Sequence, residues 1–226
     1  MLIWKGIEFR NKGIIVEKTP DISKGEKRIT TYDIPGRNGF LSVDEGTYNS
    51  FVVSVECHAR EEVNFNEICE FLDGYGTLSF DGEKEYTAII QNAIPFSKVQ
   101  MFKKFVIEFL VNPIAKDITP TEYVVSSSPS EIVIENSFYE IKPTITLNCS
   151  GDVSVTINNQ TFYLNDADGV YTLDCENKVI TNMGLNASSS MVGDFPSLYA
   201  GTNVIEYTGD ITSFVIEYKK SYLVGV

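Results

Sequence analysis

The sequence predicts a mainly β protein of two domains, and three observations carry this prediction. β-Branched residues occur throughout, and the aromatic residues are 14 Phe, 12 Tyr and one Trp, a composition that favours strands. A convincing helical spacing of apolar residues occurs once, near residues 61–72. A segment rich in Pro and Ser interrupts the chain near residue 120, as expected at a domain boundary. We therefore expect a β-sandwich-like domain with one α-helix over 1–115, a linker over 116–130, and a β-sandwich or jelly roll over 131–226.

The expected helix follows a strand, Asn49–Ala59, whose apolar residues alternate between two faces. From Glu61 to about Leu72 the apolar spacing becomes helical, and the stripe consists of Phe65, Ile68, Cys69 and Leu72. Glu61 and Glu62 suit the positive end of a helix dipole, and Gly74 suits the position after the last turn.

A strong turn signal lies between two β-rich segments in the first third of the chain. It is the pentad Pro35, Gly36, Arg37, Asn38 and Gly39. Pro presets φ for a turn, and Gly and Asn accept positive φ. We expect a hairpin from Ile29 to Val43, closed by this pentad.

The linker is expected where Pro113, Pro120 and Pro129 frame a run of three serines. Beyond it, short strands recur every eight to twelve residues, which is typical of a sandwich or jelly roll. The strands are expected at 141–147, 153–157, 160–164, 170–174, 178–181, 201–207 and 211–224. Most are separated by turn signals, at Asn158-Asn159, Asp166 to Gly169, Glu176-Asn177 and Gly209-Asp210.

The charge of the chain argues against two classes of partner. The formal net charge is −13, and affinity for nucleic acid comes mainly from Lys and Arg that release counterions. No basic amphipathic stretch suits an anionic membrane surface, and no apolar run approaches the ~20 residues that span a bilayer. We expect no specific nucleic-acid binding, no membrane association and no cleaved signal peptide, and therefore a protein made in a cytoplasm.

The sequence offers no catalytic, cofactor-binding or metal-binding constellation. His58 is the one histidine, and its neighbour Cys57 would point to the opposite face of a strand. The four cysteines are scattered without a C-x-x-C spacing and are expected to be reduced and buried: Cys57, Cys69, Cys149 and Cys175. No phosphate-binding glycine loop and no nucleophile elbow occurs. Carboxylate pairs for glycoside hydrolysis cannot be selected among 31 acidic residues. We expect no enzyme.

Two binding sites in the second domain are weighed against ordinary structure. The segment Asn165 to Gly169 looks like part of a calcium loop, but it lacks the third oxygen ligand and the later Glu. An Asx-rich turn explains it better. Carbohydrate binding is the main alternative function, because β-sandwiches often hold sugars against exposed aromatic residues. The candidates are Phe162, Tyr163, Tyr171, Phe195, Tyr199, Tyr207, Phe214, Tyr218 and Tyr222, with no Trp, and in strands such residues usually form core contacts.

Two longer motifs resemble a known family. The first is Tyr32 to Gly39, followed by Val43 to Tyr48. The second runs from Gly193 to Ile205 and contains Phe195, Pro196, Leu198, Gly201 and Asn203, followed by Tyr207 to Thr212. Their order, with the Pro-rich break between them, resembles the distal tail protein (Dit) family of long, flexible-tailed bacteriophages, and the resemblance covers nearly the whole chain.

This resemblance implies a structural virion protein at the tail tip of a phage, prophage or tail-like particle. Members form a six-fold ring in which the first domain builds the ring and a galectin-like second domain projects outward. The implied partners are the tail tube protein, the tape measure protein, the tail-associated lysin or spike and, in some phages, receptor-binding proteins for host adhesion. The absent galectin-type Trp weakens sugar binding and favours a docking platform.

A closed ring needs an interface in which one patch meets a different patch on the next copy. The hairpin Ile29 to Val43 could reach a neighbour and add strands to its sheet. Its pentad Pro35 to Gly39 is therefore the candidate ring contact. An ordinary intramolecular hairpin remains the alternative.

Overall fold

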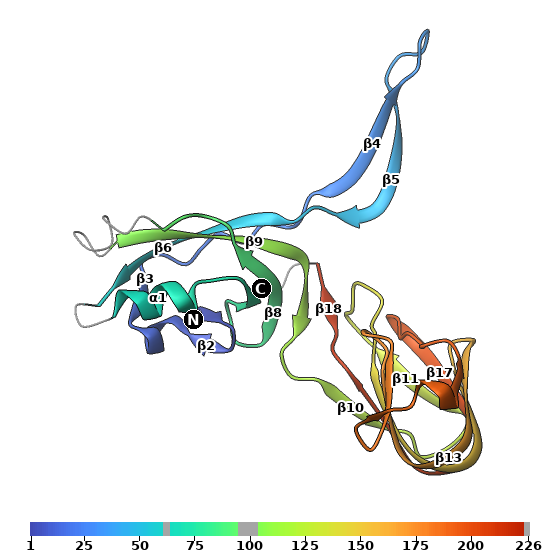
Figure 1. The fold of residues 1–226 in the computed structure, drawn as a ribbon. Coiled ribbons are helices and arrows are strands. Elements are labelled where there is room, and N and C mark those ends of the chain that lie inside the picture. The colour runs from blue at the N-terminus through green and yellow to red at the C-terminus, as the bar shows by residue number, and fades with distance from the viewer. Residues whose placement is uncertain (61–63, 95–103, 224–226) are drawn as a thin grey trace. The chain divides into compact units, whose positions relative to one another are not determined.

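The computed structural model describes residues 1–60, 64–94 and 104–223 of the chain. The chain divides into two compact units, Met1–Lys116 with Leu223 and Asp117–Tyr222 (Figure 1). Strands dominate both units, and one α-helix occurs in the described ranges. The predicted mainly β fold is thereby confirmed. None of the described helices is long and apolar enough to cross a membrane.

The first unit is built on one sheet with the strand order β2-β1-β7-β8-β9-β6-β3. Its elements are β1 (Ile3–Trp4), β2 (Ile7–Glu8), the 3-10 helix η1 (Phe9–Lys12), β3 (Ile14–Val16), β6 (Phe51–Ala59), α1 (Phe65–Phe71), β7 (Tyr75–Ser79), β8 (Lys84–Ile90) and β9 (Lys104–Asp117). The core is aromatic. Trp4 is fully buried, its ring lies 5.1 Å from that of Phe109, and its Nε1–H donates to the Phe71 carbonyl at 3.0 Å.

The helix α1 confirms the predicted apolar stripe in part. Ile68 and Leu72 are buried against the sheet, whereas Cys69 is exposed. The helix begins at Phe65 because Asn64 is extended and its side chain accepts from the Asn66 N–H at 3.1 Å. The predicted residues Glu61 and Glu62 lie outside the described ranges. Seven residues place only one face against the sheet, and Cys69 lies off that face.

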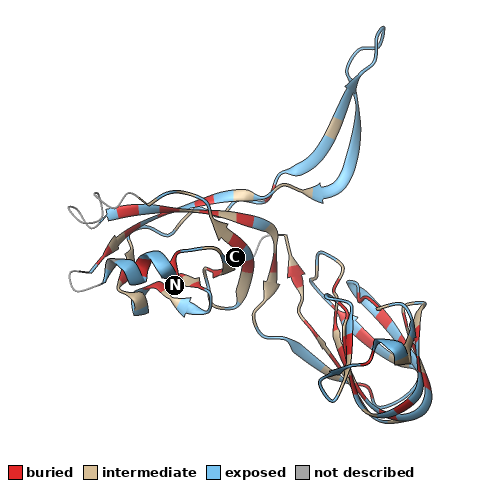
Figure 2. Cartoon of the chain, viewed as in Figure 1, coloured by how far each residue is buried: buried red, intermediate tan, exposed pale blue. Residues whose placement is uncertain are grey.

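Two strands of the first unit form a separate ribbon, which we call the arm. The strands are β4 (Lys27–Asp33) and β5 (Phe40–Tyr48), which pair only with each other. Figure 1 shows the arm extending away from the sheet, and Figure 2 shows it exposed along almost its whole length. The predicted hairpin from Ile29 to Val43 is thus present, and it forms the outer part of the longer arm.

The second unit is a sheet with the order β10-β17-β12-β13-β14-β15, in which β11 also pairs with β17 and β16 with β13. Its elements are β10 (Thr121–Val124), β11 (Ser130–Ile134), β12 (Thr144–Ile157), β13 (Gln160–Asp174), β14 (Val179–Asn182), β15 (Leu185–Asn186), the 3-10 helix η2 (Ser188–Ser190), β16 (Met191–Gly193), β17 (Gly201–Tyr218) and β18 (Ser221–Tyr222). One hydrophobic cluster takes in both halves of the long strands, including Leu147, Val155, Phe162, Leu173 and Phe214. The curved sheet therefore closes over a single core (Figure 1).

Two predicted turns are wrong. The segment Asp166 to Gly169 lies inside β13, where Gly169 still pairs with Cys149. Gly209-Asp210 lies inside β17, which continues to Tyr218. Both occur beside register shifts in the neighbouring strand β12, and glycine within a strand commonly marks such a bulge. Asx and Gly residues here bend long strands rather than reverse the chain.

The segment predicted as a linker carries ordered structure. Within 116–130, β10 pairs with β17, and the Val125 N–H donates to the Phe214 carbonyl at 2.9 Å. Val125 is buried in the core of the second unit. Proline and serine at its ends gave the segment the composition of a linker, whereas its middle, Thr121–Val124, is a strand.

Candidate assembly surface

Metal-binding groups and reactive thiols are the first features to consider among the described residues. No group of three or more His, Cys, Asp and Glu side chains there could hold a metal ion. Cys57 is buried, and burial raises the pKa of its thiol to about 12. His58 instead places Nδ1 3.3 Å from a carboxylate oxygen of Glu17. Burial likewise raises the pKa of the Cys175 thiol to about 12, so these thiols are poor nucleophiles.

The arm carries the clearest surface for assembly. Each of its strands is hydrogen-bonded on one side only, because β4 and β5 pair with no other strand. An unpaired strand edge presents free N–H and C=O groups that another chain can extend. A two-stranded ribbon is also marginally stable by itself in water. The arm is therefore a ribbon whose two outer edges are left unpaired by the described strands.

The pentad at the tip of the arm builds a tight turn. The Arg37 N–H donates to the Ile34 carbonyl at 3.1 Å, and Gly36 has φ of 81°. Proline at the second position and a positive-φ glycine at the third define a type II turn. The sequence motif Pro35 to Gly39 therefore acts through its backbone, which fixes the register of the strands behind it.

The register of the arm divides its side chains between two faces. Tyr32 lies opposite Leu41, and Thr30 lies opposite Val43. Directly opposed residues share a face, so one face presents Tyr32, Leu41 and Val43, which are each about half exposed. No described element covers this apolar strip.

The second face of the arm mixes charged and exposed apolar side chains. Lys27 and Asp44 form an ion pair there, and the hydrogen bond from Lys27 holds the pKa of Asp44 below its ordinary value. Asp33 lies opposite Phe40, whose side chain is 63% exposed. A single exposed phenylalanine is ordinary on a protein surface, but Phe40 is one of several exposed apolar residues gathered on the arm, and such a grouping is typical of an interaction surface.

The root of the arm is tied by side chains. Arg28 Nε–H donates to the Asn49 side-chain oxygen at 2.8 Å, and the Thr30 hydroxyl donates to Glu45 at 2.6 Å. Gly25 lies so close to Pro113 that a Cβ would stand 2.6 Å from the proline ring. The two hydrogen bonds join the two sides of the arm, and the close approach of Gly25 to Pro113 places the segment before β4 against β9.

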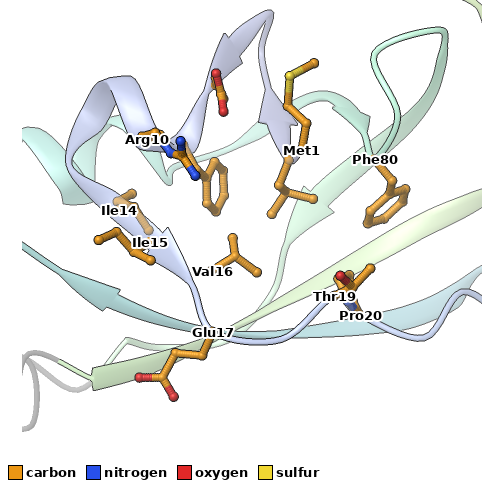
Figure 3. A pocket seen from close by; sticks show the side chains of 12 residues that line it. Met1, Arg10, Ile14, Ile15, Val16, Glu17, Thr19, Pro20 and Phe80 are labelled. Carbon is orange, nitrogen blue, oxygen red and sulfur yellow. The ribbon is translucent and has the colours of Figure 1, made fainter.

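A hollow of about 240 Å³ opens elsewhere on the first unit, between the chain's first residues and the segment after β3 (Figure 3). Its exposed lining is about equally polar and apolar, and its apolar side chains include Val16, Pro20 and Phe80. Arg10 and Glu8 also line it. Drug-sized ligands usually occupy about 300–1,000 Å³, so the hollow suits a single large side chain better.

Glu17 borders the hollow, but its carboxylate is already engaged. Lys104 Nζ lies 2.9 Å from Oε1, and the hydrogen bond from Lys104 lowers the pKa of Glu17 below its ordinary value. His58 lies at the same oxygen. In Figure 3 the Glu17 side chain points away from Arg10. Glu17 therefore links the end of β3 to β6 and β9. It forms no ion pair with Arg10.

The C-terminal motif from Phe195 to Asn203 combines buried residues with an exposed stretch, 199–202. Pro196, Ser197, Leu198 and Asn203 are buried, and Leu198 exchanges two backbone hydrogen bonds with Ile141. The Asn203 side-chain oxygen accepts from the Tyr199 N–H at 2.8 Å and from Asn158 at 2.6 Å. Its amide donates to the carbonyls of Tyr199, Gly201 and Ile132. The buried residues of the motif thus hold a loop in place, and the exposed residues 199–202 lie on the surface of that loop.

Few of the aromatic side chains that the sequence offered as sugar contacts remain available in the second unit. Phe162, Tyr171 and Phe214 are buried, and Tyr207 packs against Phe214 with ring centres 5.9 Å apart. Tyr163 and Tyr199 are about half exposed. The Tyr199 hydroxyl lies 3.4 Å from Glu140, which also binds Lys142 at 2.7 Å.

Sequence reasoning located the arm but missed the hollow. A local turn signal between two β-rich segments predicts the arm. The hollow joins the N-terminal residues to Phe80, which are distant in sequence, and no local pattern marks such a contact.

The fold of the chain is similar to that of a solved phage protein. A crystal structure of the SPP1 Dit (gp 19.1) protein matches with a TM-score of 0.75, covering 98% of this chain and 98% of that chain at 11% sequence identity. That protein is described as a paradigm of the hub adsorption apparatus in phages that infect Gram-positive bacteria. No family model and no curated protein matches this sequence. The resemblance to distal tail proteins that the sequence motifs predict is therefore confirmed at the level of the fold.

Proposed function

We propose that this chain is a structural protein of a phage or prophage tail tip, where six copies form a ring that serves as the hub of the adsorption apparatus. The observation that carries the proposal is the similarity of fold to the SPP1 Dit protein over 98% of both chains. Such a hub would join the tail tube and tape measure proteins to the lysin or spike and to receptor-binding proteins.

The structure of the arm is consistent with the proposed ring. A cyclic assembly of more than two copies needs a contact between two different patches, one on each neighbour. The arm supplies one such patch, since it extends from its own sheet with both outer edges unpaired and an apolar strip of Tyr32, Leu41 and Val43. Burial of that strip against the next copy would supply the hydrophobic contribution.

The acidity of the chain suits a hub through which DNA passes. A surface of net negative charge repels a phosphate backbone, because it offers few cations to replace the counterions of DNA. The chain carries 31 acidic and 18 basic side chains. DNA would therefore pass such a ring without being retained by it.

Light scattering coupled to size-exclusion chromatography tests the ring. We expect a mass about six times the 25.3 kDa of one chain. A variant in which a short Gly-containing turn replaces the arm from Thr30 to Val43 should lose the assembly while keeping its thermal stability, because the arm pairs with no other described strand. A monomer at high concentration, unchanged by removal of the arm, would contradict the proposal.

Carbohydrate binding by the second unit is the second candidate function. It rests on the exposure of Tyr163 and Tyr199, the latter beside a polar cluster of Glu140 and Lys142. Glycan-array binding that disappears in Tyr163→Ala or Tyr199→Ala would support it. Absence of binding to any glycan by the intact chain would leave the second unit as a docking platform only.

A further inference from the structure

We propose that the hollow lined by Val16 and Phe80 is the receptor for the arm tip of a neighbouring copy, with Phe40 inserted and Asp33 paired with Arg10. This inference rests on the proposed ring, and it names the surface that receives the arm. The occupant is a second copy of this chain.

The first argument is the match between an exposed aromatic side chain and a hollow of side-chain size that has apolar residues in its wall. Phe40 is 63% exposed near the end of the arm. The hollow offers about 240 Å³ between polar and apolar side chains, and the half-buried Val16 and Phe80 are among the apolar ones. Inserting an aromatic ring would remove apolar surface of both partners from water, and large aromatic anchors in pockets dominate the energetics of interfaces.

The second argument is the position of the charges. On the arm, Asp33 lies directly opposite Phe40, and Arg37 follows in the turn. On the hollow, Arg10 and Glu8 both line the rim. No ion pair is found for any of these four side chains within the described part of the chain. Each surface thus carries one unpaired charge of each sign, and a Phe40 seated in the hollow would bring Asp33 to the rim beside Arg10.

The third argument is directional. The arm and the hollow are different patches of the same unit, built from 27–48 and from the segments around η1 and β3. In Figure 1 the arm extends from the sheet away from β2 and β3. A contact between such patches is head-to-tail, so each copy that donates an arm also receives one. This is the type of contact that a closed ring requires.

Sedimentation velocity of single variants tests the contact. Phe40→Ala and Arg10→Asp should each weaken self-association by about tenfold or more, as expected for an anchor residue and its charged partner. Tyr75→Ala and Arg60→Asp are matched controls, because Tyr75 is 73% exposed and neither residue lines the hollow. The controls should associate as the unchanged chain does. All four positions are exposed or at a rim, so thermal unfolding should shift little.

Two further experiments separate this pairing from a general loss of charge or of fold. Reversing both charges in one chain, Asp33→Arg with Arg10→Asp, should restore much of the association that each reversal alone removes. Mixing Phe40→Asp with Arg10→Asp provides one intact arm and one intact hollow, so the mixture should form heterodimers that stop at two subunits.

The outcomes distinguish this inference from the proposed function. If the arm deletion abolishes the ring but Phe40→Ala and Arg10→Asp leave it unchanged, the ring stands and the hollow is not the receptor. A mixture that forms no heterodimer, or a charge reversal that restores nothing, would likewise overturn the inference. If the unchanged chain does not self-associate at all, both the ring and the inference fail.

Discussion

Asn203 shows how a polar side chain can organise a loop from inside the protein. It is fully buried, accepts from the Tyr199 N–H and from Asn158, and donates to backbone carbonyls. Buried polar groups are costly only when they lack partners. The sequence motif around Asn203 was therefore informative about the fold, although nothing in one sequence distinguishes a buried clamp from an exposed contact.

Replacing Asn203 by leucine should destabilise the second unit severely. The substitution keeps a similar volume but leaves the Tyr199 N–H and the Gly201 carbonyl without their partner. We expect a loss of at least about 2 kcal/mol in the free energy of unfolding, measured by urea denaturation. Asn165→Ala, at an exposed position of β13, is the control and should change stability by less than about 0.5 kcal/mol. Equal stability of the two variants would contradict the role given to Asn203.

Glu140 gives the second unit a pH-dependent contact. The hydrogen bond from Lys142, together with one from Ser197, lowers the pKa of Glu140 below its ordinary value of 4.5. A carboxylate with a lowered pKa contributes stability above that ordinary value, and the contribution is lost as the pH falls through the lowered pKa.

Glu140→Gln should therefore destabilise the chain at pH 7 and make no difference in acid. We expect the urea midpoints of the variant and the unchanged chain to differ at pH 7 and to converge below about pH 4.5 as Glu140 itself becomes protonated. Glu131→Gln, at an exposed position of β11, is the control, and its urea midpoint should match that of the unchanged chain at pH 7 and in acid. A constant gap at every pH would mean that Glu140 acts through packing alone.

The strands of the second unit show where sequence patterns fail at the scale of elements. Thr144–Ile157, Gln160–Asp174 and Gly201–Tyr218 are single long strands, although each contains residues that favour turns. A Cβ at Gly209 would stand 2.5 Å from the Asp152 carbonyl, so glycine is needed there for close approach of two strands. Whether such a residue reverses the chain depends on the register of the neighbouring strand, which the local sequence does not contain.

The arm is the contrasting element, because its local sequence is sufficient. The turn at Pro35 and Gly36 is a type II turn that depends on residues within four positions. The alternation on both sides of the turn then decides which residues share a face. This explains why the hairpin was predictable while its exposed apolar strip, which depends on the absence of a covering element, was not.

Gly36→Ala should loosen the arm without affecting the rest of the unit. Gly36 has φ of 81°, and a Cβ in that conformation costs about 1 kcal/mol. Because β4 and β5 pair only with each other, amide hydrogen exchange should quicken within 27–48 and remain unchanged in β6 and β9. Asn38→Ala, in the same turn but without the need for positive φ, is the control. Faster exchange throughout the sheet would show that the arm is not independent.

Charge is divided unequally at the scale of the whole molecule. Residues 117–222 contain 14 acidic and four basic side chains, so this stretch carries a net −10 of the total −13. The four are all lysines, and Lys142 is paired with Glu140. A partner that docks on the second unit would therefore gain from a basic surface, which would speed association at low ionic strength.

The boundary between the two units also decides which fragments of the chain should fold independently. The sequence favoured a second domain that starts at residue 131, whereas the structure groups Asp117–Tyr222 and places β10 on β17, with Val125 in the core. A fragment of residues 117–222 should fold by itself, with a cooperative thermal transition and dispersed amide NMR signals. A fragment of 131–222 lacks β10 and Val125, exposes an edge of β17, and should unfold at a temperature lower by several degrees or aggregate. If both fragments melt at the same temperature, β10 belongs to a linker after all, and the boundary lies at the position that composition alone suggested.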